Sequence, residues 1–330
     1  MNVDTGSNYL MSPKIDFAFK LIFGDEKHKE ITIAFLTAVL KVPKGELADI
    51  EIINSELLRQ YEQDRKGILD VRVKTRDGRQ IDIEIQILPT VFMPERTLFY
   101  WSKMYASQIR AGDGYELLKK CITINIVDFD CTPLKQVHSC YTANWHNFTF
   151  LIPHPNPPPL GEGVYEKRRL CQFAVYHLTE DINKGHRLTD VLEVHFLELP
   201  KLFEEGISIR EDDAIVQWML FIDGSSMEVM EMLAEKNKDI WSAYSLLKII
   251  SNDEKTRMVY EAREAELMDQ RTRIKSAEEI GVKRGKAEII QVLLARGMTV
   301  EDVASIAGMD ISGVAEIQKG VLGHAENVKI

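Results

Sequence analysis

Two short segments that alternate apolar and polar residues flank the triplet Arg76-Asp77-Gly78, and they constrain the fold more than any other part of the chain. In LDVRVKTRDGRQIDIEIQI, residues 69–87, the alternation has a period of two on both sides of the triplet. That period belongs to β-strands, whose successive side chains point to opposite faces. The sequence therefore predicts a β-hairpin over residues 69–87.

The length of the turn decides which side chains of this hairpin share a face. A two-residue turn would place the two apolar rows on opposite faces, so that one row would lose its core. A three-residue loop with Gly78 in a left-handed conformation pairs Asp70 with Glu84 and Arg72 with Asp82. Both apolar rows then face one core, and we predict this register.

The predicted register brings two carboxylates together on the polar face. Directly opposed residues have Cβ atoms about 4.5–5.5 Å apart, a distance at which Asp70 and Glu84 repel each other unless a cation lies between them. Oxygen ligands favour Mg²⁺, with Mn²⁺ as a second choice, and such a metal activates water for attack on a phosphodiester. Gln86 follows on the same face and can orient the attacking water. The polar row alone is more typical of an ordinary solvent-exposed face than of a metal site.

Composition limits the classes of protein to which the chain can belong. Its 330 residues are 45% apolar, enough for one large domain with a smaller appendage. The net charge of −10 excludes broad electrostatic attraction to nucleic acid, so any contact with DNA must be local. No window approaches the roughly 18 apolar residues of a membrane span, and residues 1–13 have no apolar run. We expect a cytoplasmic protein with no membrane contact, whose four cysteines, lacking paired spacing, are free thiols.

The order of the expected elements predicts an α/β fold. Gly24 and the polar residues 25–30 divide the helical pattern of residues 14–40 into two helices, the first starting at Ser12-Pro13. Further strands are expected at 50–58 and 121–129, and further helices at 96–109, 188–203 and 214–249. The succession of helices, a strand cluster, a helix and a strand fits a sheet flanked by helices.

Two changes of composition divide the chain into domains. Residues 153–163 hold five prolines and two glycines, so we predict a surface insertion at about 152–169, with an ordinary proline-rich loop as the alternative. We expect a first domain over 1–250. After it, residues 251–286 form a charged helical linker, and residues 287–330 form a small helical unit.

This last unit has the pattern of a degenerate helix-turn-helix. Thr299 is placed to cap the helix VEDVASIA, and Gly308 lies in the turn before ISGVAEI. The second helix carries Glu316 and no arginine, which is poor for reading a major groove. We expect these C-terminal helices to mediate homo-oligomerisation.

Several runs of the chain resemble the Rpn family of recombination-promoting nucleases and transposases, in the PD-(D/E)xK nuclease superfamily. These runs are spread over nearly the whole chain, except the proline-rich segment. They are DFAFKLIFGDEKHKEITIAFLTAVL at 16–40, ILDVRV at 68–73, IDIEIQ at 81–86, RTLFYWSKMYASQIRAGDGY at 96–115, HFLELPK at 195–201 and GVKRGKAEIIQVLLARGMTVEDVASIAG at 281–308. The resemblance implies a restriction-endonuclease-like core, a mixed sheet flanked by helices, followed by an α-helical C-terminal region.

Carried over residue by residue, the resemblance assigns the first acid of the family motif to Asp70 and its E-x-Q motif to Glu84 and Gln86. Glutamine replaces the lysine of the wider superfamily. Asp16 matches an acidic residue of the N-terminal helix, either as a third carboxylate at the metal or as an acid favoured by the helix dipole.

The resemblance also assigns residues that can contact DNA. Lys20 either approaches a DNA phosphate or pairs with Asp16 one helical turn away, and we favour the pair. Arg96, Tyr100 and Tyr105 match the helix that follows the hairpin, where they either contact the DNA backbone or pack in the core.

The resemblance implies a metal-dependent DNA endonuclease that promotes recombination or horizontal gene transfer and hydrolyses phosphodiester bonds with a metal-activated water. The alternative is a catalytically weak or inactive transposase-related protein of mobile-element origin that binds DNA or protein. A DDE-type strand-transfer transposase needs three widely spaced acids, which the close spacing of Asp70 and Glu84 does not suit.

Overall fold

The computed structural model describes the chain in two compact units, Met1–Arg263 and Glu264–Ile330. Within them, the described residues are 9–53, 70–134, 136–142, 175–176, 189–205, 212–224 and 226–320. The predicted insertion at 152–169 and residues 54–58 of the strand expected at 50–58 lie outside the described residues.

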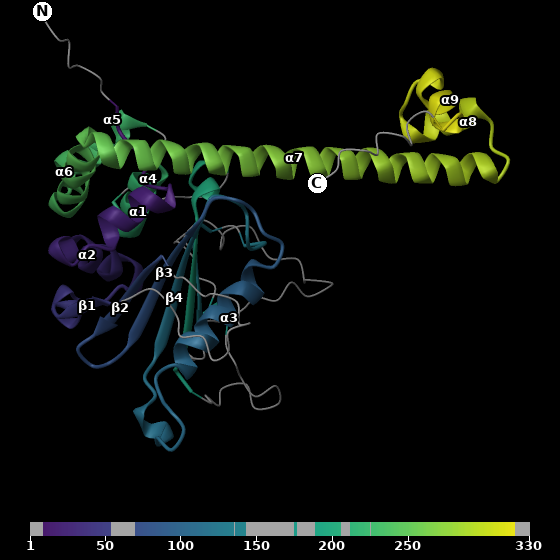
Figure 1. Ribbon diagram of the computed structural model, residues 1–330. Helices are drawn as coiled ribbons and strands as arrows, with labels where there is room; N and C mark the ends of the chain where they lie inside the picture. The colour runs from purple at the N-terminus through teal and green to yellow at the C-terminus, as the bar shows by residue number, and fades with distance from the viewer. Residues whose placement is uncertain are drawn as a thin grey trace, which may run out of the picture. The chain divides into compact units, whose positions relative to one another are not determined.

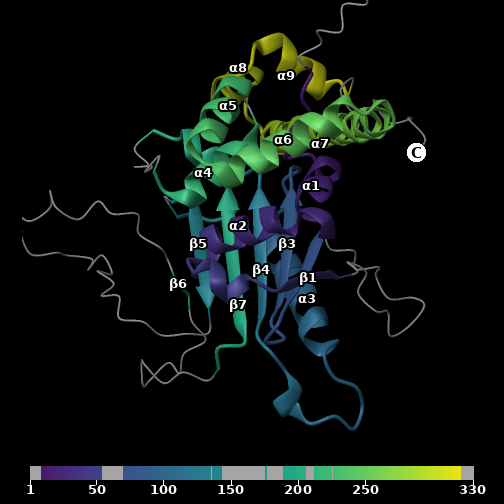
Figure 2. The same cartoon turned by 90° about the vertical axis from the view of Figure 1, so that its left-hand side faces the viewer.

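A mixed sheet of seven strands forms the centre of the first unit, in the order β1-β2-β3-β4-β7-β5-β6 (Figure 2). The strands are β1 Ile50–Ile53, β2 Val71–Thr75, β3 Gln80–Gln86, β4 Cys121–Val127, β5 His138–Thr142, β6 Val175–Tyr176 and β7 Leu192–Glu198. β3, β4 and β7 are parallel to one another, whereas β1, β2 and β3 form an antiparallel meander. The prediction of a mixed sheet flanked by helices is confirmed.

The hairpin of β2 and β3 has the predicted register. Arg72 lies opposite Asp82, and the Thr75 amide donates a hydrogen bond of 3.0 Å to the Arg79 carbonyl, which leaves three residues in the loop. Gly78 has a φ of +89°, in the region that favours glycine. The hairpin therefore has the three-residue loop, which places both apolar rows on one face, as the alternation of the sequence predicted.

One face of the sheet carries the apolar rows of the hairpin and is covered by α1 (Asp16–Phe23), α2 (Lys29–Leu40) and α4 (Ala214–Asp223) (Figure 2). Aromatic rings form the centre of this layer: the Phe23 ring lies 5.3 Å from that of Phe35 and 5.8 Å from that of Trp218, between centroids. All three side chains are fully buried. Aromatic pairs at these distances contribute about 0.5–1.5 kcal/mol each beyond the area that they bury.

The other face of the sheet carries the polar row of the hairpin, and α3 (Met93–Ala106) covers it (Figure 1). The Thr97 hydroxyl donates to the Asn125 side-chain oxygen at 3.0 Å, and the Trp101 indole donates to the Cys121 carbonyl at 3.0 Å. Both acceptors belong to β4. Asp82 and Glu84 of the polar row are buried, whereas Lys74 is exposed. The interpretation of this row as an ordinary solvent-exposed face is therefore wrong for its β3 side.

The remaining helices follow the sheet or connect its strands. They are α5 Met227–Lys236, α6 Lys238–Asn252, α7 Glu254–Ala295, α8 Val300–Ala307 and α9 Ile311–Gln318, with short 3₁₀ turns at Glu26–His28, Lys44–Leu47, Tyr115–Leu117 and Leu199–Phe203. None of the described helices is long and apolar enough to cross a membrane. Cys121 and Cys131 are free thiols, as expected.

The predicted start of the first helix at Ser12-Pro13 is wrong. The helix begins at Asp16, after an N-cap residue, Ile15, that provides no side-chain hydrogen bond. Tertiary contacts explain the difference: the Ser12 amide donates to the Tyr260 hydroxyl at 3.0 Å, and the Met11 amide donates to the Ser251 hydroxyl at 3.0 Å. These bonds hold the segment against α6 and α7.

The helix expected at 188–203 is also wrong, because residues 192–198 form the strand β7. β7 pairs in parallel with β4 on one side and antiparallel with β5 on the other. A strand that is covered on both faces is apolar at nearly every position. Such a run has no clear period of two, so the sequence pattern does not distinguish a strand from a helix.

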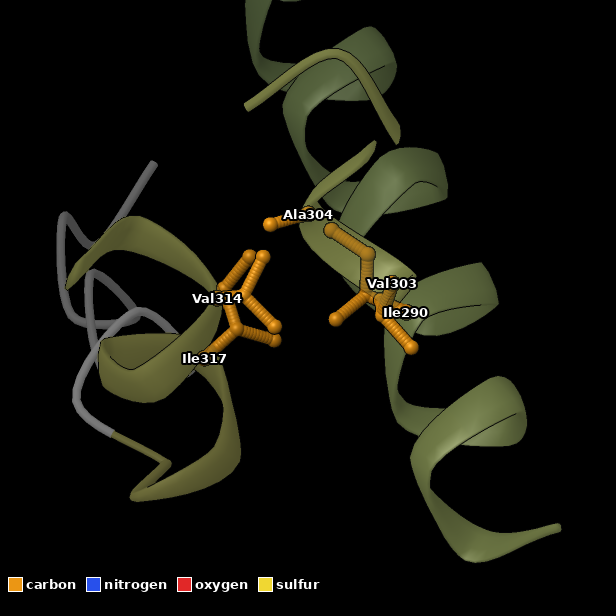
Figure 3. Close-up of a cluster of buried hydrophobic side chains, with 5 residues drawn as sticks. All are labelled: Ile290, Val303, Ala304, Val314 and Ile317. Carbon is orange, nitrogen blue, oxygen red and sulfur yellow. The ribbon is translucent and has the colours of Figure 1, made fainter. Parts of the chain in front are cut away.

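The second unit contains the predicted pair of short helices. The Thr299 hydroxyl accepts a hydrogen bond of 3.1 Å from the Asp302 amide at the start of α8, and Gly308 ends α8 with a φ of +60°. Their core is a small cluster of buried side chains, Ile290, Val303, Ala304, Val314 and Ile317 (Figure 3). The predicted domain boundaries near residues 250 and 286 stay a prediction.

Replacing Gly78 by alanine tests the hairpin turn. We expect Gly78→Ala to lower the free energy of unfolding by about 1–2 kcal/mol, because an L-residue is strained at positive φ and the new Cβ would lie 3.1 Å from the Lys119 Cγ. Urea unfolding measures the change. Gly45→Ala is the control, because its Cβ meets no atom within 4 Å; equal losses in both variants would contradict the assigned turn.

Candidate functional site

Asp70 and Glu84 lie together across the hairpin. Asp70 precedes β2, and its Oδ2 accepts a hydrogen bond of 2.8 Å from the Ile85 amide. The Asp70 amide in turn donates to Glu84 Oε1 at 3.1 Å. Each carboxylate therefore bonds the backbone of the other strand, which fixes both groups to the sheet.

A cation pairs with each of these two carboxylates. Lys20 Nζ, from α1, lies 2.9 Å from Asp70 Oδ1, and Arg96 Nη2, from α3, lies 3.6 Å from Glu84 Oε2. Glu84 is only 5% exposed. The site thus receives one basic side chain from each of two helices.

Asp82 is a third carboxylate of this face, which sequence reasoning left out of the site. It is 1% exposed, and neither of its oxygens has a hydrogen-bond partner among the described residues. Arg72 lies opposite it in the register. The alternation of Asp82, Glu84 and Gln86 was the available signal, because all three occupy the same face of one strand.

Burial dominates the protonation of these acids. It raises the pKa of Asp70, against the lowering effect of Lys20, and it raises the pKa of Asp82 well above its usual range. Burial, and next the charge of Asp70, raise the pKa of Glu84 to about 8. Three neighbouring carboxyl groups in a low dielectric therefore favour either bound protons or an added cation.

The predicted pairing of Lys20 with Asp16 is wrong. Asp16 accepts instead from Arg263 Nε, at 2.9 and 3.1 Å to its two oxygens, while Lys20 pairs with Asp70. Asp70 is the more deeply buried acid, so the nearby cation compensates a larger desolvation cost there. Asp16 still lies close enough for its charge to raise the pKa of Asp70.

The remaining predicted site residues, Gln86, Arg96, Tyr100 and Tyr105, have different partners. The Gln86 amide donates to the Leu88 carbonyl at 3.0 Å, which orients it at the end of β3. The Arg96 guanidinium lies over the Tyr100 ring, 5.3 Å from its centroid. Tyr105 stacks on Trp101 with ring centroids 5.0 Å apart. It therefore has the packing role that we gave as the alternative to DNA contact.

The donors on this face fit a hard divalent cation. Among the residues described, no three or more His, Cys, Asp or Glu side chains converge closely enough to hold a metal ion by themselves. Mg²⁺, however, commonly binds through one or two carboxylates and takes its other ligands from water and substrate phosphates. Asp70 and Glu84 supply such a pair, and the unpartnered carboxyl group of Asp82 lies beside Glu84 on the same face of β3.

The opposite face of the sheet holds a separate buried polar chain. His138 Nε2 lies 2.8 Å from His195 Nδ1, His195 Nε2 lies 2.6 Å from Glu193 Oε1, and Glu193 Oε2 lies 2.5 Å from Lys120 Nζ. Burial lowers the pKa of His138 well below its usual range. This chain extends from Lys120, the residue before β4, through β7 to β5.

The mixed sheet and the helices that cover it agree with the PD-(D/E)xK nuclease fold, and the chain belongs to that family. A family model described as PD-(D/E)XK nuclease family transposase matches residues 13–147 and 166–277, more than half of the chain. The residues between the two matched ranges overlap the predicted proline-rich insertion. No match was found among curated proteins or among solved structures.

The raised pKa of Glu84 predicts how stability depends on pH. Between its usual value of 4.5 and about 8, the folded protein keeps a proton that the unfolded chain has released, so the free energy of unfolding falls as pH rises. The slope is at most about 1.4 kcal/mol for each pH unit. We expect Glu84→Gln, which does not titrate, to flatten this slope in urea unfolding between pH 5 and 8 with EDTA.

The exposed Glu51 of β1 provides the control for this measurement. Glu51→Gln should keep the pH dependence of the wild type, because it removes an exposed carboxylate of the same sheet and leaves the Asp70, Asp82 and Glu84 cluster unchanged. A Glu84→Gln slope equal to that of the wild type would show that Glu84 is ionised in the folded protein.

Proposed function

We propose that this protein is a metal-dependent DNA endonuclease that hydrolyses phosphodiester bonds and thereby promotes recombination or horizontal gene transfer. The pairing of Asp70 with Glu84 across the hairpin carries the proposal. Its support is chemical: two buried acids held together by backbone hydrogen bonds have unfavourable mutual repulsion that a divalent cation relieves. Membership of a nuclease family agrees with this activity.

Asp70 and Glu84 would hold the cation, Mg²⁺ or alternatively Mn²⁺. The bound ion would lower the pKa of a water molecule and stabilise the charge that develops on the phosphate. Gln86 would orient that water or the substrate from the end of β3. Asp16, which Arg263 already pairs, would act as a more distant carboxylate of the metal site.

Lys20, Arg96 and Tyr100 would contact the DNA. Lys20 and Arg96 each compensate one carboxylate in the structure, and a bound cation would take over that role. Both side chains are partly exposed, so their charge could then turn to the phosphates beside the scissile bond. Tyr100, beneath the Arg96 guanidinium, would support that side chain. A local pair of cations suits a protein whose net charge is −10.

Cleavage of supercoiled plasmid tests the proposal. The wild-type protein should nick the plasmid with Mg²⁺ or Mn²⁺ and not with EDTA. Asp70→Asn and Glu84→Gln keep the shape of the side chains but remove the charges that hold the metal, so each should lower the nicking rate by about 100-fold or more. Gel electrophoresis over time gives the rates.

Glu51→Gln is again the matched control, because it removes one exposed carboxylate from the same sheet. It should nick at the wild-type rate. Nicking by Asp70→Asn and Glu84→Gln at that same rate would show that the site lies elsewhere.

Metal binding is tested separately from cleavage. A cation that binds only the folded state should raise the free energy of unfolding by about 2.7 kcal/mol at a concentration 100 times its Kd. We expect Mn²⁺ and Mg²⁺ to raise it in the wild type and not in Asp70→Asn, as measured by urea unfolding without DNA. An equal rise in both proteins would contradict Asp70 as a ligand.

A second candidate is a catalytically weak or inactive relative that binds DNA or protein. The observation in its favour is that Lys20 and Arg96 already pair with the two carboxylates, as in a site that holds no metal. This candidate predicts no rise in stability with either cation and no cleavage. Homo-oligomerisation through the C-terminal helices also stays a proposal; Ile306 of α8 and Ile311 of α9 are exposed there.

A further inference from the structure

The outer face of α3 exposes aromatic and basic side chains in one stripe. Phe92 is the N-cap residue just before α3, and Arg96, Phe99 and Lys103 follow it at intervals of four, three and four residues. This spacing places the three helical side chains on one side of α3, next to Phe92. Phe92 is 68% exposed and Phe99 is 40% exposed. Large aromatic side chains that remain this exposed in one patch usually mark a binding surface.

Cations and rings alternate along this stripe. Lys103 Nζ lies 5.1 Å from the centroid of the Phe99 ring, and the Arg96 guanidinium lies 5.3 Å from that of Tyr100. The rings of Phe99 and Tyr100 are 5.5 Å apart. Such an alternation offers flat apolar faces and positive charge together, which a partner with aromatic rings and negative charges complements.

The stripe begins at the candidate active site. Arg96 belongs to both, because its Nη2 lies 3.6 Å from Glu84 Oε2 while its guanidinium lies over Tyr100. Glu95 is the one acidic residue of α3 and lies at the edge of the stripe, where Arg96 and Lys103 outnumber it. Positive charge next to buried carboxylates favours an anionic polymer over a second acidic protein chain.

We propose that this stripe, Phe92, Arg96, Phe99 and Lys103, binds unpaired nucleotides of the DNA substrate by stacking their bases on Phe92 and Phe99. The inference rests on the proposed nuclease function and adds a substrate preference to it. Bases in a duplex hide their faces against their neighbours, whereas bases in a single strand, bubble or flap expose them. The stripe therefore favours DNA that contains unpaired nucleotides close to the site of cleavage.

DNA binding by the full-length chain tests this inference. Fluorescence anisotropy is measured in EDTA, so that nothing is cut, with a fluorescein-labelled 20-nucleotide single strand and with the duplex of the same sequence. The wild-type protein should bind the single strand more tightly. Phe92→Ala and Phe99→Ala should each weaken single-strand binding by about tenfold, and should change duplex binding by less than about twofold.

The conservative variants and a control keep the test specific. Phe92→Trp and Phe99→Trp retain a ring and should bind the single strand as tightly as the wild type does. Phe203→Ala, which removes a 61% exposed ring from the 3₁₀ turn after β7, should leave both affinities unchanged. All three positions changed are exposed, and urea unfolding of each variant checks that the fold is kept.

Three results would overturn the inference. Equal affinity of the wild type for single strand and duplex would remove the preference. Equal weakening of both by the alanine variants would show that the rings act without stacking on bases. A loss of self-association by these variants in sedimentation, with DNA binding unchanged, would make a second copy of the chain the occupant. Because binding is measured without metal, these results are independent of whether the protein cuts DNA.

Discussion

The pairing of β2 with β3 in a single register is the constraint on which the rest of the site depends. A shift by one residue would turn every side chain of one strand to the other face, and the isoleucines would lose their core. The same pairing places Asp70 next to Glu84. The Asp70 amide then donates a hydrogen bond to the Glu84 carboxylate, and the Ile85 amide donates one to the Asp70 carboxylate. Packing of the apolar face therefore fixes the geometry of the polar one.

Burial of acids under α3 then determines the electrostatics. Asp82 and Glu84 lie between the sheet and a helix, where ionisation is costly, and their pKa values are raised for that reason. Lys20 and Arg96 approach from two different helices and compensate part of the charge. The site is thus a cluster of buried carboxyl groups with positive side chains at its border. That distribution suits a cation inside and a polyanion outside.

Helix α3 has two faces with different tasks. Its inner face is held to β4 by the Thr97 hydroxyl and the Trp101 indole, and these bonds fix the height of the helix over the polar row. Its outer face presents Phe92 and Phe99 to solvent. Arg96 lies at the boundary of the two faces and contacts Glu84. A rigid helix can in this way hold a cation over the carboxylates and carry a surface for substrate beside them.

The alternation of residues 69–87 was enough to predict the hairpin, its three-residue loop and the pairing of Asp70 with Glu84, because a period-two pattern and one shared core leave a single register. The helix caps at Thr299 and Gly308 were also predictable from the sequence, because a cap depends only on residues that are close in the chain. Three other features could not be predicted in this way: residues 192–198 form a strand, Arg263 and not Lys20 pairs with Asp16, and Asp82 is buried without a partner among the described residues. Each of these outcomes depends on contacts between segments that are distant in the sequence. The fold brings those segments together, and no local sequence pattern predicts such contacts.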